Sequence, residues 1–220
     1  MPFGIYMAFI ALESVVSWVS EPFAVRSSGS NLWSLWLYPA KITAVLVALW
    51  LFWPRYKELH QPGTMSMMQI FMALGVGTLV YLAWVRMAWP WAIQGQMTAY
   101  NPFDAGANVG IALAAIRFFG ATVVVPPMEE LFWRSFLLRW LITTPFTAVR
   151  PGTFTPVSCA VTVILFGFEH HLWLAGIMAG LAYTLLLYQA RNLWACILAH
   201  AMTNGLLGCH VLLTREWHWW

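Results

Sequence analysis

Side chains that could catalyse a reaction lie at three places in an otherwise apolar second half of the chain. They are Glu129, Glu130, Arg134, Glu169, His170, His171, His200 and Asn204. Together they supply carboxylates, imidazoles and an amide, a set that suits activation of a water molecule. A glutamate can take the proton of the water while a histidine positions it, and a second histidine and an asparagine can donate to the tetrahedral oxyanion.

A metal site is the alternative chemistry for the same residue types. One glutamate with two histidines, here Glu129, His170 and His200, resembles the three-ligand set of a catalytic zinc, which leaves one position for water. The residue types do not separate a metal-bound water from a bare one. The chain contains no HExxH motif, which makes a zinc protease of that type a poor interpretation.

The first motif follows two prolines. Pro126-Pro127 should begin a new helix, which would put both glutamates in its first turn, where the helix dipole favours negative charge. Glu130 and Arg134 are four residues apart and share a face, whereas Glu129 is rotated by about 100°. We therefore expect Arg134 to neutralise Glu130 and to leave Glu129 free. A structural ion pair at a capped helix start is the other interpretation.

The histidines form the second and third motifs. His170 and His171 point about 100° apart on a helix, so they should not serve the same site, and His171 could replace His170 if the helix is rotated. His200 and Asn204 are four residues apart and share a face, where both could reach a small ligand or an oxyanion. A polar clasp between two helices is the alternative for this pair.

The remaining sequence must place these side chains within a membrane. The 220 residues are 61% hydrophobic and 9% charged, against roughly 25% charged residues in a soluble domain. A spanning helix needs about 20 mostly apolar residues, so we expect an all-α, polytopic membrane bundle of about eight hydrophobic helices. The expected spans are Phe3 to Val19, Leu32 to Trp53, Met67 to Val85, Asn108 to Val125, Met128 to Ile142, Pro156 to Trp173, Trp173 to Tyr188 and Leu193 to Leu213.

Short connections between these spans predict one integral membrane domain over residues 1–220, with a catalytic core at about 108–213. The positive-inside rule would place the basic loop 55–58 in the cytoplasm and the connection 94–108 on the other side, although Arg26 and Arg150 do not follow this pattern. The connection 94–108 could border the substrate entrance or be an ordinary interfacial loop. A net charge of +3 without a basic cluster predicts no nucleic-acid partner.

The ordered motifs resemble those of a known family. Glu129, Glu130 and Arg134 read as EExxxR, Phe166 and His170 as FxxxH, and His200 and Asn204 as HxxxN. In this order the set is similar to the CPBP family of intramembrane proteases, which includes the CAAX prenyl endopeptidases of the Rce1 type. The resemblance covers about residues 108–213. The short chain is also similar to the bacterial CAAX protease-related proteins associated with exosortase sorting systems.

The resemblance implies a role for each matching residue. Glu129 and His170 would activate water, Glu130 and Arg134 would support the site, and His200 and Asn204 would stabilise the oxyanion. The substrate would be a protein or peptide, prenylated or sorted, cut near its C-terminus. The host membrane would be a bacterial or archaeal inner membrane, with membrane lipid around the chain. The cofactor would be a divalent metal such as zinc, or none.

Two other functional classes remain open in the sequence. A non-catalytic membrane partner or scaffold of a sorting or immunity system would typically have lost a catalytic residue, and none is lost here. A proton-coupled carrier would need polar groups across both halves of the bilayer. Within its apolar segments the first half offers only Glu13, Lys41 and Arg86.

Overall fold

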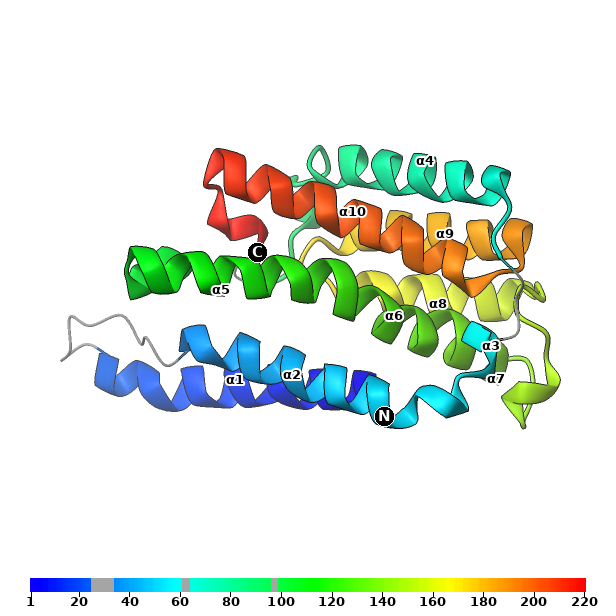
Figure 1. The fold of residues 1–220 in the computed structure, drawn as a ribbon, viewed down its shortest axis with the longest axis horizontal. Helices are drawn as coiled ribbons and strands as arrows, with labels where there is room; N and C mark the ends of the chain where they lie inside the picture. Colours follow the sequence, from blue (N-terminus) through cyan, green and yellow to red (C-terminus); the bar gives the residue numbers. More distant parts are fainter. Residues whose placement is uncertain (25–33, 61–63, 96–98) are drawn as a thin grey trace.

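The chain folds into a bundle of helices that run roughly along one long axis (Figure 1). The computed structural model describes the backbone of residues 1–24, 34–60, 64–95 and 99–220. Arg26, the expected start of the second span at Leu32, and residues 96–98 of the polar connection lie outside the described residues. Within the described ranges there is no strand, only an isolated bridge between Ile93 and Leu172. The all-α interpretation is confirmed.

Five helical stretches of the described chain are long and apolar enough to cross a membrane, so the chain is a helical membrane protein. The helices are α1 (Pro2–Ala24), α2 (Ser34–Phe52), α3 (Lys57–His60), α4 (Met67–Trp84), α5 (Ala107–Phe119), α6 (Val125–Glu130), α7 (Leu138–Trp140), α8 (Pro156–Phe168), α9 (Trp173–Ala190) and α10 (Leu193–Thr214). Short 3₁₀ turns lie at Trp53–Arg55, Pro90–Ala92, Pro102–Ala105, Phe146–Ala148 and Trp217–Trp219.

The expected helix start at Pro126-Pro127 is wrong, because one helix continues from Ala107 to Trp140. The prolines are accommodated by a π-helical stretch, Gly120–Val124, in which the Val125 N–H donates five residues back to the Gly120 carbonyl. A second π-helical stretch, Leu131–Leu137, follows. A π-helical turn changes which backbone carbonyl oxygens lie close to the proline rings. Such turns often occur at functional sites. The glutamates therefore lie in mid-helix, and the helix dipole does not explain them.

Close helix approaches depend on small residues. A Cβ on Gly77 of α4 would overlap the Ala199 carbonyl oxygen of α10 and would lie 2.8 Å from the Met202 Cβ. On the α8–α9 pair, a Cβ on Gly176 would lie 3.0 Å from the Gly167 Cα. Small residues at crossings let helix backbones pack closely where lipid offers no hydrophobic driving force.

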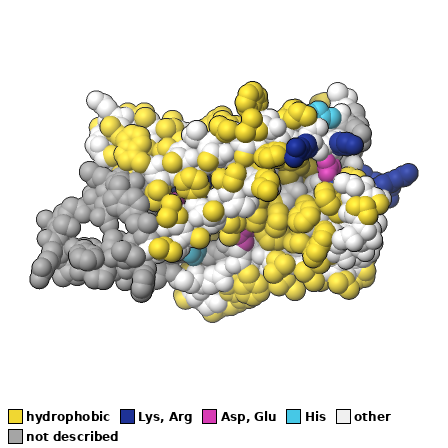
Figure 2. Space-filling view, turned by 90° about the horizontal axis from the view of Figure 1, so that it is seen from below, with side chains coloured by type: hydrophobic (Ala, Val, Ile, Leu, Met, Phe, Trp, Pro, Cys, Tyr) yellow, Lys and Arg dark blue, Asp and Glu magenta, His cyan; other side chains and the backbone are white. Residues whose placement is uncertain are grey.

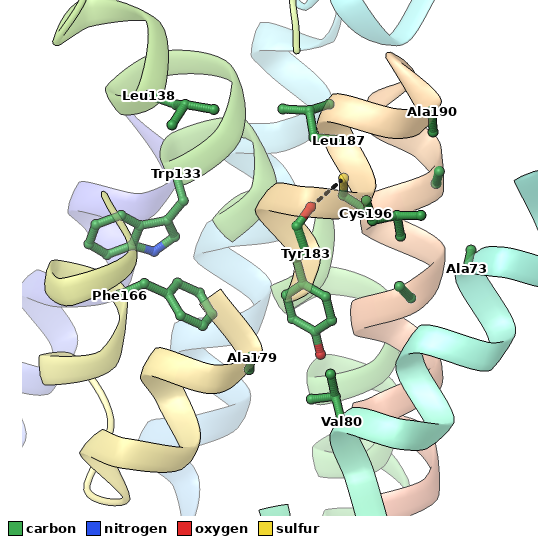
Figure 3. Packing of buried hydrophobic residues seen from close by; sticks show 13 residues of the cluster. Ala73, Val80, Trp133, Leu138, Phe166, Ala179, Tyr183, Leu187, Ala190 and Cys196 are labelled. Carbon is green, nitrogen blue, oxygen red and sulfur yellow. Dashed lines mark hydrogen bonds between the residues drawn. The ribbon is translucent and has the colours of Figure 1, made fainter. Parts of the chain in front are cut away.

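The core lies around α9, which packs against α8 on one side and against α4 and α10 on the other, while the long helix Ala107–Trp140 contacts both α8 and α10. Figure 3 shows Tyr183 and Leu187 of α9 with Trp133 and Phe166 on one side and Val80 on the other. Tyr183 also ties α9 to α10, because its carbonyl accepts from the Cys196 thiol at 3.3 Å. This packing places the polar residues of the three motifs against buried aromatic rings.

Basic side chains gather at the end of the bundle that carries α3 and α7 (Figure 2). Arg150, which the sequence could not place, lies there and lines the same cavity as Arg55 and Lys57. Arg150 therefore lies at the same end of the bundle as the basic loop 55–58, and it agrees with the expected difference in charge between the two ends.

Candidate active site

Glu130, Arg134 and His200 form a buried charge network. Both the Glu130 and the Arg134 side chains are 0% exposed, and Arg134 Nε and Nη1 each lie 3.2 Å from a Glu130 carboxylate oxygen. His200 Nδ1 lies 2.9 Å from Glu130 Oε1. The expected Glu130–Arg134 pair is confirmed. The network contains a third member, His200, that the helical spacing of the sequence had not joined to Glu130.

Aromatic rings hold this network in place. The Arg134 guanidinium carbon lies 4.2 Å from the Phe166 ring centroid, and Arg134 Nη2 donates to the Gly180 carbonyl at 3.3 Å. Tyr183 stacks on the His200 ring with centroids 5.1 Å apart, and its hydroxyl donates to Thr203 Oγ1 at 2.7 Å. Sequence reasoning missed Tyr183 and Thr203, whose hydroxyls in apolar helices were the available signal.

Phe166 is the residue around which the three motifs meet. Its ring lies under Arg134 of the first motif, 4.8 Å from the His170 ring of the second, and 6.3 Å from the His200 ring of the third. Arg134, His170 and His200, which are about 30 to 70 residues apart in the sequence, therefore all pack against the buried Phe166 ring. We call these four residues the Phe166 cluster. The order of the motifs along the chain did not show that this phenylalanine would join them.

Glu129 differs from its neighbour in having no hydrogen-bond or ion-pair partner among the described residues. Its side chain is 5% exposed, its Oε2 is buried without a hydrogen-bond partner, and no described side chain donates to it. A buried carboxylate left in this state costs several kcal/mol on most scales unless water, an ion or a proton satisfies it. Glu129 is therefore the carboxylate of the pair that can act on a ligand. No described hydrogen bond joins it to His170, His200 or Asn204.

His170 is oriented by its own helix. Its Nδ1 lies 2.8 Å from the Phe166 carbonyl oxygen. Because a carbonyl can only accept, Nδ1 must carry the proton, and the neutral ring then has its lone pair on Nε2. Trp84 packs edge-on against the ring at 5.4 Å. The half-buried ring thus presents one available basic nitrogen.

The turn that carries His170 is fastened by Gln94. Gln94 Nε2 donates to the carbonyls of Phe168 at 2.7 Å and His170 at 2.8 Å, and its backbone N–H donates to the His171 carbonyl at 2.8 Å. His171 is exposed and its Nδ1 donates to the Gln94 carbonyl at 3.0 Å. His171 therefore contacts the segment that carries Gln94 and lies outside the Phe166 cluster. No motif or residue spacing indicated that Gln94 would contact this turn.

Asn204 donates from Nδ2 to the Ala121 carbonyl at 2.9 Å. In the π-helical register that carbonyl would pair with the N–H of residue 126, which is proline and has none. Asn204 thus satisfies a backbone acceptor freed by Pro126, as neighbouring side chains do in membrane helices. One Nδ2 hydrogen and Oδ1 remain for other partners.

Glu169 adds another carboxylate next to the cluster. Its Oε2 accepts from Trp133 Nε1 at 3.0 Å, and Trp133 packs edge-on against Phe166 at 5.7 Å. The sequence marked Glu169 only as a residue beside His170. Its indole partner comes from the long helix, and this contact between separate motifs could not be read from the spacing.

The arrangement of possible donor side chains bears on the metal alternative. Among the described side chains, those of residues 1–15, 35–60, 64–95 and 99–220, no three His, Cys, Asp or Glu residues come close enough to hold a metal ion. Glu129, His170 and His200, as placed, do not form a three-ligand site. Metal dependence therefore stays a prediction, which the metal content of the active protein would test.

Comparison with known proteins gave one family. Residues 111–206 match the family described as Type II CAAX prenyl endopeptidase Rce1-like. No curated protein and no solved structure matches the chain. The matched segment runs from within α5 into α10 and contains every residue of the three motifs.

Proposed function

Since residues 111–206 belong to the Rce1-like family of type II CAAX prenyl endopeptidases, we propose that the chain is an intramembrane endopeptidase in which Glu129 and His170 activate the attacking water. The observation that carries this proposal is the buried, unpartnered Glu129 carboxylate beside a cluster in which all three motifs meet at Phe166. We further propose that the peptide bond it cleaves lies near the C-terminus of a membrane-associated protein.

The first step needs a base and an acceptor that orients the water. Glu129 takes one proton from the water as the water oxygen attacks the scissile carbonyl carbon. His170 Nε2 accepts a hydrogen bond from the other water O–H. His170 suits this role because its Nδ1–H is held by the Phe166 carbonyl. A positioned general base contributes about 10²- to 10⁴-fold to such a step. The proton then passes from Glu129 to the leaving amine.

The second requirement is a donor to the oxyanion. Because His200 Nδ1 faces the Glu130 carboxylate at 2.9 Å, His200 can donate from Nε2 only as the imidazolium. The single Glu130 carboxylate would then lie between this imidazolium and the Arg134 guanidinium, so the three groups would carry one net positive charge, which is complementary to an oxyanion. Asn204 offers its second Nδ2 hydrogen. Loss of one oxyanion donor costs about 3–4 kcal/mol in well-studied cases.

Cleavage of defined peptides by the purified protein in lipid nanodiscs tests this function. We expect the parent chain to cleave, and His170→Ala and His200→Ala to lose activity while staying folded. His171→Ala is the matched control, because this neighbouring histidine lies outside the cluster. Peptide binding without cleavage by the parent chain would favour a non-catalytic scaffold, and loss of activity in His171→Ala alone would contradict the assignment of His170.

The same assay addresses the substrate. Peptides of one sequence with and without a prenyl group, and with a free or an amidated C-terminus, separate a preference for lipid from a preference for the terminal carboxylate.

We propose that the basic end of the bundle faces the cytoplasm, because the lysines and arginines of the short loops gather there.

A further inference from the structure

A large cavity lies at the basic end of the bundle. Its volume is about 1160 Å³, above the range of about 300–1,000 Å³ that is usual for small-molecule sites. The start of α1, the segment 55–58, the long helix and the loop 146–151 line it. The cavity is therefore bounded by four separate parts of the chain and has room for an amphiphile.

The rim of this cavity carries cations that lack carboxylate partners. Arg55, Lys57 and Arg150 are exposed, and none of them pairs with an acidic side chain in the described part of the chain. Glu58, the only carboxylate among the described lining residues, is already bound by Ser135 and by an ion pair with Arg139. The rim therefore has an excess of positive charge, which is complementary to an anionic group.

The inner wall of the cavity is aromatic and apolar. Phe3 of α1 stacks on Phe132 with ring centroids 3.9 Å apart, and Phe132 packs edge-on against Trp133 at 4.9 Å. Phe136 packs edge-on against Phe146, another lining residue, with ring centroids 5.2 Å apart. None of Glu129, Glu130, His170, His200 or Asn204 lines the cavity. It is thus separate from the proposed peptidase cluster.

We propose that this cavity binds an anionic phospholipid. The phosphate lies among Arg55, Lys57 and Arg150, and the acyl chains lie along the aromatic wall formed by Phe3, Phe132 and Phe136. Basic pockets between membrane helices are suited to lipid headgroups, because each lysine or arginine near the surface favours the anionic lipid. A peptide substrate fits less well, since it would have to reach residues that the cavity does not contain. The proposal does not depend on the peptidase function.

The charge requirement is tested by lipid retention. The purified protein is loaded in detergent with phosphatidylglycerol or phosphatidylcholine of identical acyl chains, and retained lipid is counted by native mass spectrometry. We expect preference for phosphatidylglycerol and, at roughly fivefold for each cation removed, about 25-fold weaker retention in Arg55→Gln/Arg150→Gln. The matched control is Arg86→Gln/Arg215→Gln, which removes the same charge just after α4 and α10 (Figure 1), at residues that do not line the cavity, and should leave retention unchanged.

The volume requirement is tested by filling the cavity. Gly4 lines it, and a Cβ at Gly4 would meet no atom within 4 Å. Gly4→Leu should therefore reduce lipid retention without disturbing packing. Gly75 of α4 has equally open surroundings but lies away from the cavity, so Gly75→Leu is the control and should retain lipid like the parent chain.

Three results would overturn the proposal. Equal retention of both lipids would show that the protein does not recognise the charge of the headgroup. Equal losses in the two arginine double variants, or in the two glycine variants, would show that lipid binds around the bundle and not in the cavity. Displacement of the lipid by a substrate peptide that crosslinks to Phe136 would assign the cavity to the peptide.

Discussion

The buried pair of Glu130 and Arg134 allows a quantitative test. Arg134→Met removes a guanidinium that is 0% exposed and lies 3.2 Å from the carboxylate, which leaves the Glu130 charge without its main partner. Breaking one side of a buried pair costs about 3–5 kcal/mol. The lost hydrogen bond to the Gly180 carbonyl and the contact with the Phe166 ring place the expected loss of unfolding free energy in the upper part of that range.

The partner substitution and the double variant make the test specific. Glu130→Gln leaves Arg134 charged and buried, so we expect a loss of similar size. Glu130→Gln combined with Arg134→Met removes both charges, and its loss should be smaller than the sum of the two by about 2 kcal/mol, within the range for residues in contact. Equilibrium unfolding in mixed micelles, followed by tryptophan fluorescence, measures all three free energies.

Arg86→Met is the control for this cycle. Arg86 is exposed and has no ion pair in the described part of the chain, so its replacement should change the unfolding free energy by no more than about 0.5 kcal/mol. The reasoning would be refuted by an Arg134→Met variant within about 1 kcal/mol of the parent. Strict additivity in the double variant would equally show that the two charges do not stabilise each other.

Three further outcomes follow from particular contacts. Gly77→Ala should lower the unfolding free energy by about 1–3 kcal/mol because its Cβ would overlap α10, whereas Gly75→Ala, in open space on the same helix, should be neutral or stabilising in the same unfolding assay; equal effects would contradict the close approach. Burial raises the pKa of the Glu58 carboxyl, but hydrogen bonds and charge from Ser135 and Arg139 outweigh this and hold the pKa below 4.5. The Glu58 contribution is thus present above about pH 4.5 and lost as the pH falls through the folded pKa, so the stability difference between the parent and Glu58→Gln should shrink on acidification; a difference independent of pH would rule this out. Gln94→Ala should lower kcat by up to about 30-fold with little change in KM, because two hydrogen bonds to the His170 turn are lost at about 1 kcal/mol each; an unchanged kcat would show that the turn keeps its conformation without Gln94.

Helical spacing and composition predicted much of the architecture. Apolar length identified the membrane helices, and the four-residue spacing correctly paired Glu130 with Arg134. The prolines misled the interpretation, because the penalty for proline inside a helix assumes an α-helical register. Here π-helical turns and Asn204 accommodate Pro126, and neither feature is visible in the local sequence.

Contacts between distant segments account for the rest of the site. The partner of His200 is Glu130, 70 residues away, and the group that fastens the His170 turn is Gln94, 76 residues away. Such contacts depend on how α10 and the loop after α4 pack on the bundle, which residue spacing does not encode. Phe166 could be found as part of a motif, but its position between Arg134, His170 and His200 could not.

The central claim is that Glu129 activates the attacking water, and Glu129→Gln tests it most directly. The substitution keeps the shape of the side chain and removes only the basic carboxylate. Cleavage of one peptide is measured for the parent and the variant in nanodiscs, with metal content determined on the same samples. We predict at least a hundredfold loss of kcat in a variant that unfolds like the parent. Full activity in the folded Glu129→Gln protein would contradict the account.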